Sequence, residues 1–242
     1  MAKFYGPIAK TGKVGGSVFK IRHGETIESQ YQPVVFNPST KSQRSVRVAF
    51  GLLTQVARSL ASIIGFRRVG SVSPRNRFVS ANFASVSDPV ESGGEIKRDI
   101  LVTNIDLTGG AEALPQLSTP VVTGSSVAVS LISPAPPAVS RVLYSLVGIK
   151  EGSQLFVLDT VVAETPGANS VFESTLTLPT GASGNFAVFA YGMIDVTDNA
   201  RVTYERYKAT SSPVAAMKTV IERLSSSDVV LSETRVLVFT QA

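Results

Sequence analysis

Hydrophobic and polar positions alternate through most of the second half of the chain, in short runs separated by turn-forming residues. Val127, Val129 and Leu131 occupy every second position of one run, and residues 186–190 repeat the pattern. A period of two places such side chains on one face of a β-strand. The alternation and its turn signals predict strands near residues 78–86, 96–107, 119–133, 140–149, 154–163, 171–178, 185–194 and 201–208.

A helical period replaces this alternation between residues 42 and 64. Asn37 before Pro38, or a capping box of Thr40 and Gln43, begins a helix near residue 40. Gly65 is placed to end it. Apolar residues recur at steps of three and four: Val46, Ala49, Phe50, Leu53, Val56, Ala57, Leu60, Ile63 and Ile64. The opposite side carries Arg44, Arg47, Gln55, Arg58 and Ser59, so the helix is amphipathic and basic.

Shorter patterns lie at the two ends of the chain. Residues 1–36 are punctuated by glycines and contain one short alternating run, which predicts an extended arm with a hairpin or an added strand. Such a hairpin is marginal alone, so we expect a partner surface to order it. Near the other end, Ser212-Pro213 begins a short helix that reaches residue 224, and residues 229–238 predict a hairpin around 232–234.

These elements predict a mainly β protein, with an immunoglobulin-like antiparallel β-sandwich, an N-terminal extended arm and one amphipathic helix. The 242 residues are 43% hydrophobic, which suffices for a core. We expect residues 1–77 to hold the basic arm, the helix and a basic hinge, and residues 78–242 to form the sandwich with its short helix.

The net charge of +5 is unevenly distributed along the chain. Residues 1–77 contain 13 Lys and Arg against two Glu, whereas residues 78–242 contain 10 against 16 acidic residues. The first region is therefore attracted to phosphate or to acidic protein surfaces, and both partners stay open: non-specific nucleic acid contact, or neighbouring protein subunits. The candidate contact residues are Lys10, Lys13, Lys20, Arg22, Arg44, Arg47, Arg58, Arg67 and Arg68.

Little in the sequence suggests catalysis. The chain has no cysteine, and its one histidine, His23, lies in the basic arm. Asp195, Asp198 and Asn199 occupy an expected turn, and they lack the spacing of an EF-hand loop. The glycines of residues 12–17 lack the phosphate-binding loop signature. We therefore predict no enzymatic activity, no cofactor and no metal site.

Three segments of the sequence bear on whether the protein contacts a membrane. Residues 1–7 lack the apolar core of a secretory signal, and residues 51–66 are too short and too polar to span a bilayer. The helix at 42–64 has the cationic amphipathic character of a membrane-surface helix, but its apolar face has no Trp and suits a core or subunit contact better. We expect no membrane partner.

Several short motifs resemble an uncharacterised family of proteins from Bacteroidetes and their phages. The motif N-P-x-T-x-x-Q-R spans residues 37–44 and is followed by Arg47 and Phe50, which is also similar to phage particle proteins. Residues 12–15 and Gly24 precede it. Leu158-Asp159, Leu178-Pro179 and residues 202–207 resemble the family's immunoglobulin-like second half. The resemblance implies a virion component and no catalytic residue.

The sequence thus predicts a non-enzymatic bacteriophage virion structural protein, made in the bacterial host cytoplasm and located in the virion. It would be a minor capsid, decoration or vertex/tail-associated component that assembles through its arm and helix with other virion proteins and copies of itself. A packaging protein that binds the genome through the basic segment is the first alternative. A host-surface adhesin is the second.

Overall fold

The chain consists of two compact units, Met1–Thr40 and Lys41–Ala242. The computed structural model describes residues 3–4, 12–14, 17–22, 25–30, 39–136, 138–150, 154–164, 166 and 171–241. Helix α1 follows the first unit directly, and its buried side chains belong to the core of the second. The expected division at residue 77 therefore differs from the observed one, because the amphipathic helix is part of the body.

The first unit contains an antiparallel sheet with strand order β1-β4-β3-β2. The sequence predicted an extended arm with a hairpin here, and the described residues instead form four strands. Thr26 is buried, whereas Ile21 is 47% exposed. Whether a partner orders this unit stays a prediction. The strands are β1 (Lys3–Phe4), β2 (Gly12–Val14), β3 (Ser17–Arg22) and β4 (Glu25–Gln30).

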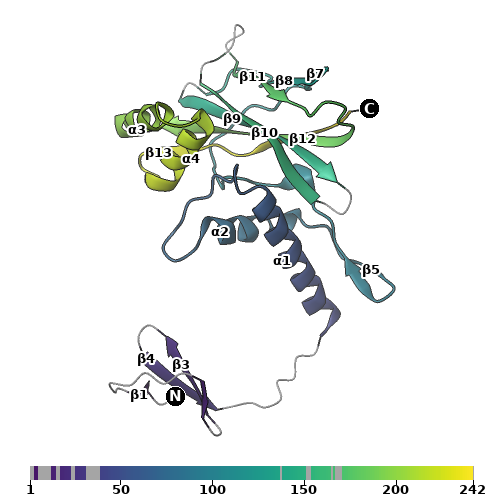
Figure 1. Ribbon diagram of the computed structural model, residues 1–242, viewed down its shortest axis with the longest axis vertical. Helices are drawn as coiled ribbons and strands as arrows, with labels where there is room; N and C mark the ends of the chain where they lie inside the picture. The colour runs from purple at the N-terminus through teal and green to yellow at the C-terminus, as the bar shows by residue number, and fades with distance from the viewer. Residues whose placement is uncertain are drawn as a thin grey trace. The chain divides into compact units, whose positions relative to one another are not determined.

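A five-stranded antiparallel sheet forms the centre of the second unit (Figure 1). Its order is β10-β9-β12, and both β13 and β14 pair with the far side of β12. Strands β9 and β12 are apolar on both faces, as expected for strands that are covered on both sides. The strands are β9 (Val139–Lys150), β10 (Gln154–Ala163), β12 (Gly184–Asp195), β13 (Val229–Leu231) and β14 (Arg235–Gln241).

A smaller sheet covers one face of the central sheet. Leu146 and Val188 pack on this side with Val127 and Leu176. The order is β11-β8-β7, and Gly124 makes the turn between β7 and β8 with a φ of 62°. This sheet consists of β7 (Val121–Thr123), β8 (Ser126–Ser130) and β11 (Glu173–Thr177).

Helices cover the opposite face, where Val147 and Phe189 meet Leu53 of α1 and Met217 of α4. The body thus has three layers: helices, central sheet and small sheet (Figure 1). The prediction of a mainly β protein with antiparallel sheets is confirmed. The sequence predicted one amphipathic helix and one short helix, which is fewer than the structure contains. The four α-helices of the described chain are α1 (Lys41–Ser59), α2 (Pro74–Ala81), α3 (Asp198–Lys208) and α4 (Pro213–Arg223).

Helix α1 begins where the sequence predicted, but it ends at Ser59 and does not continue to Gly65, and its apolar face is narrower than expected. Ala49, Leu53 and Val56 are buried in the core. Val46 and Phe50, which were assigned to the same face, are 48% and 55% exposed. They lie at the edge of the buried stripe, one helical turn apart, so the helix presents both apolar and basic residues to solvent.

Three predicted strands are wrong. Residues 78–86 lie in α2 and the 3₁₀ turn η1 (Phe83–Ser85), because Ser73 caps a helix that begins at Pro74. Residues 201–208 lie in α3, which buries Ala200 and Tyr204 four residues apart. Residues 96–107 contain the end of β6 (Glu95–Lys97) and the 3₁₀ turn η2 (Val102–Asn104), and the remainder is irregular. Strand β6 pairs with the preceding β5 (Val90–Ser92) in a hairpin.

The terminal hairpin is also wrong, because β13 and β14 do not pair with each other. Both lie along β12, with Leu231 opposite Met193 and Arg235 opposite Ala190. The segment around Gly110 passes against the backbone that connects β13 to β14. A Cβ atom added to Gly110 would lie 2.2 Å from the carbonyl oxygen of Leu231. Only glycine fits this crossing. The strands near 140–149, 154–163, 171–178 and 185–194 and the helix near 213–224 are confirmed.

Gly110→Ala should lower the free energy of unfolding by about 2 kcal/mol or more, because the colliding atoms belong to backbone that cannot rotate away. Gly51→Ala is the matched control. Its Cβ would meet nothing within 4 Å in the middle of α1, so it should raise stability by up to about 1 kcal/mol. Urea denaturation of both variants measures this, and equal stability of the two would contradict the crossing.

Candidate functional site

The structure separates the nine predicted contact residues into three groups. Lys10 lies outside the described residues, as do the side chains of Lys13 and Arg22, although their backbones belong to β2 and β3. Lys20 is exposed on β3, opposite Ile27 of β4. The remaining five lie in the second unit and differ in what they contact.

The side chain of Arg44 binds other residues of the same chain. Its Nη1 donates to the carbonyl oxygen of Gly94 at 2.7 Å, and its Nη2 pairs with Glu91 at 3.2 Å. Lys41 pairs with the same carboxylate at 3.1 Å. The hydrogen bond from Lys41, followed by its charge and by Arg44, lowers the pKa of Glu91. These two cations therefore fasten the β5–β6 hairpin to α1, which changes the expected role of Arg44.

Arg67 is also engaged, in the hinge between α1 and α2. Its Nη2 donates to the carbonyl oxygen of Val229 at 2.7 Å. Arg77 donates to the carbonyl oxygen of Arg67 at 3.1 Å and lies over the ring of Phe66, 5.5 Å from its centre. Burial, and then the charge of Arg77, lower the pKa of Arg67, while Asp228 opposes this. The hinge is thereby attached to β13.

Arg47, Arg58 and Arg68 remain exposed and form no hydrogen bond or ion pair with the described residues. Arg47 and Arg58 are eleven residues apart in α1, which is close to three turns, so both lie on its solvent side. A cavity of about 400 Å³ adjoins Arg58 and is also lined by Arg75 and Lys218. We call Arg47, Arg58, Arg68, Arg75 and Lys218 the basic surface.

Two members of the basic surface reach into the helical layer. Arg75 donates to the carbonyl oxygen of Thr54, and Lys218 donates to that of Ala61 at 2.8 Å. Sequence reasoning left both out of the predicted site. The Ser73-Pro74 capping signal places Arg75 in a first helical turn, whereas nothing in the sequence brings Lys218 of α4 to α1.

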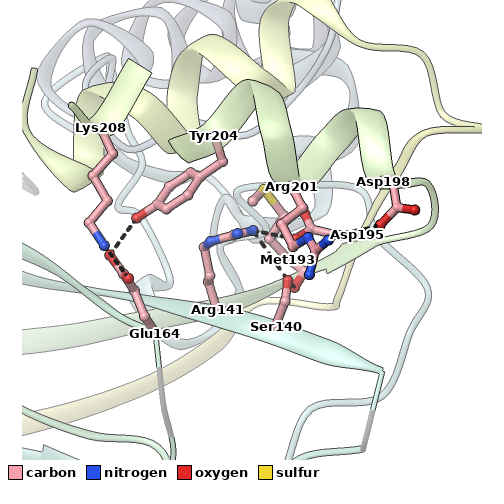
Figure 2. Close-up of polar contacts among 9 residues, drawn as sticks. All are labelled: Ser140, Arg141, Glu164, Met193, Asp195, Asp198, Arg201, Tyr204 and Lys208. Carbon is pink, nitrogen blue, oxygen red and sulfur yellow. Dashed lines mark hydrogen bonds and ion pairs between the residues drawn. The ribbon is translucent and has the colours of Figure 1, made fainter. Parts of the chain in front are cut away.

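A further polar cluster lies between α3 and the central sheet (Figure 2). Arg141 is buried, pairs with Asp195 at 2.6 Å and lies 3.7 Å from the centre of the Tyr204 ring. Tyr204 donates to Glu164 at 2.8 Å, and Lys208 donates to the other oxygen of that carboxylate at 2.5 Å. The cluster thus joins β9, β10 and β12 to one face of α3.

This cluster positions a helix rather than offering a free acid or base. Burial raises the pKa of Glu164, but hydrogen bonds from Lys208 and Tyr204 outweigh it and lower the pKa overall. Burial raises the pKa of Tyr204, and Glu164 raises it further. Glu164 is therefore held as an anion and Tyr204 as a neutral donor. One oxygen of Asp195 is buried without a described partner.

The acidic turn expected at residues 195–199 is only partly a turn. Asp195 ends β12 and is paired with Arg141, while Asp198 begins α3 and pairs with Arg201 at 3.3 Å (Figure 2). The carboxylates point to different partners. No group of three or more potential ligands that could hold a metal ion occurs among the residues that the structure describes, and no helix there is long and apolar enough to cross a membrane.

Comparison with family models, curated proteins and solved structures found no match to this chain. The resemblance of residues 37–44 to a phage-associated family therefore stays a prediction.

Glu164→Gln should destabilise the protein near neutral pH and much less in acid. A carboxylate whose pKa is lowered on folding stabilises the fold above its unfolded pKa, near 4.5, and this stabilisation is lost as the pH falls through the folded value. The urea midpoints of wild type and variant at about pH 7 and about pH 3 measure the difference. Tyr204→Phe, which removes one donor and keeps Lys208, should be intermediate at pH 7. A gap of the same size at both pH values would refute this assignment.

Proposed function

We propose that this chain is a non-enzymatic structural protein of a bacteriophage particle, a minor capsid, decoration or vertex/tail-associated component, that assembles through its N-terminal unit and α1. The particle context comes from the N-P-x-T-x-x-Q-R motif at residues 37–44. The observation that carries the assembly role is the exposed apolar pair Val46 and Phe50 at the edge of the buried stripe of α1, close in sequence to Arg47.

This pair is a better protein contact than a phosphate contact. Phe50 is 55% exposed and Val46 48%, although Ala49, Leu53 and Val56 of the same helix are buried in the core. An aromatic residue beside an arginine is the composition of interface centres, where charged residues other than Arg are scarce. The proposed partner is therefore another protein subunit.

The first unit offers a second mode of contact through its strand edges. Strand β2 pairs with β3 only from Ser17 to Phe19, and β1 pairs with β4 only at Thr26 and Ile27. Within the described part of this unit, Lys20–Arg22 of β3 and Glu28–Gln30 of β4 have no outer neighbour. Such edges accept a strand from another chain through backbone hydrogen bonds.

Phe50→Ser tests the role of α1. Burial of the exposed part of the ring in an interface contributes about 1 kcal/mol, so the variant should be incorporated into particles roughly fivefold less well. Phe83→Ser is the matched control, because Phe83 is also exposed, at 39%, but lies in η1. Quantitative mass spectrometry of purified particles measures both, with thermal unfolding of the isolated chains to show that they fold. Normal incorporation of the folded Phe50→Ser variant would overturn the proposal.

A packaging role, with contact to nucleic acid, is the second candidate, and the basic surface favours it. Arg47 and Arg58 are exposed and unpaired among the described residues, and Arg58 borders a cavity with Arg75 and Lys218. Phosphate contacts release counterions, so affinity for DNA of any sequence would fall steeply with salt.

The double variant Arg47→Gln with Arg58→Gln separates the two candidates. If both residues meet phosphates, the slope of log affinity for DNA against log salt should decrease in magnitude by about two. Lys97→Gln with Arg206→Gln makes the same change of net charge at exposed positions elsewhere. We expect weak DNA binding by all chains, because the apolar pair favours protein contact. A steep slope that only the Arg47 and Arg58 variant reduces would promote the packaging role.

A further inference from the structure

A second, smaller cavity of about 220 Å³ lies beside the hinge and is not part of the proposed assembly surface. Arg67 and Arg77 line it from the hinge, residues 108–111 line it from the crossing segment, and Ser226 and β13 close it. Its lining contains two arginines and no carboxylate. The cavity near Lys218 differs in this respect, because Glu222 contributes to its wall.

Both guanidinium groups are held in place and keep donors to spare. Arg67 is fixed by the carbonyl oxygen of Val229, and Arg77 by the carbonyl oxygen of Arg67 and the ring of Phe66. A guanidinium has five N–H donors, and each of these two gives only one to a described partner. The remaining donors are pre-organised without a protein acceptor among the described residues.

The two positive charges lack a counter-ion inside the cavity. Asp228 is the acidic residue that acts on Arg67, but its carboxylate accepts hydrogen bonds from Ser225 at 2.6 Å and from Thr197 at 3.0 Å. Asp228 attracts Arg67 more strongly than Arg77 repels it, but Asp228 does not line the cavity. An anion between the two arginines would accept hydrogen bonds from their free N–H groups, and arginine forks suit the oxygens of a phosphate group.

We propose that the cavity formed by Arg67, Arg77, residues 108–111 and Ser226 binds a phosphate group, either free or as an ester. The volume is sufficient, since a water molecule occupies about 30 Å³ in the liquid and the cavity holds several times that. The phosphate would join the hinge, the crossing segment and β13. This site stands independently of the assembly role.

Inorganic phosphate is the first probe, titrated by calorimetry into the full chain at low ionic strength. Wild type should bind it, and Arg77→Gln should bind at least about tenfold more weakly, because charge-assisted hydrogen bonds are lost. Arg68→Gln is the matched control: it removes the same charge from an exposed neighbour that does not line the cavity. Equal affinity of the two variants, or no binding by wild type, would overturn the proposal.

Ser226→Asp covers the case in which Arg77→Gln fails to fold. Ser226 is exposed in the turn before β13, and the substitution places a carboxylate at the cavity while both arginines stay. This variant should fold and lose phosphate binding at least tenfold; wild-type affinity in the folded variant would overturn the proposal. A short DNA strand without terminal phosphates then identifies the source. If this DNA displaces inorganic phosphate from the cavity, the natural ligand is a nucleic acid backbone. If the DNA does not displace it, the natural ligand is free phosphate or a terminal phosphate ester.

Discussion

The burial of β9 and β12 on both faces is the constraint on which the rest of the body depends. Leu146 and Val188 face the small sheet, while Val147 and Phe189 face the helices. Because neighbouring residues point in opposite directions, the two strands require two separate layers to cover them. Helix α1 is therefore a structural part of the body, and only the edge of its apolar stripe is left for a partner.

The packing of the helices on the central sheet also determines how much of the basic charge faces solvent. Residues 41–77 contain eight Lys and Arg and no acidic residue, yet much of this charge is used within the chain. Arg44 meets the β5–β6 hairpin, and Arg67 and Arg77 fasten the hinge. What remains outward is the smaller basic surface, together with Val46 and Phe50. A strong charge asymmetry in the sequence thus overstates the charge that the surface offers to other molecules.

The sequence predicted elements well where one pattern dominates. Strands β9, β10, β11 and β12 and helices α1 and α4 lie where alternation or helical spacing placed them. The prediction for residues 201–208 was wrong because apolar Val202 and Tyr204 alternate with polar neighbours, as in a strand. In the structure Ala200 and Tyr204, four residues apart, are the buried residues of α3, and Tyr204 packs on Arg141, far away in the sequence. For the same reason Lys218 and the Arg141 cluster were missed. Contacts between distant elements leave no local periodicity.

The way in which β13 and β14 share β12 affects how the protein is made. Within the part of the chain that the structure describes, the outer edge of β12 pairs only with β13 and β14, which are synthesised after β12, α3 and α4. During translation β12 therefore presents an unpaired, apolar edge of the kind that invites pairing with other chains. The central sheet is therefore incomplete, and its edge is open to mispairing, until β13 and β14 have emerged from the ribosome.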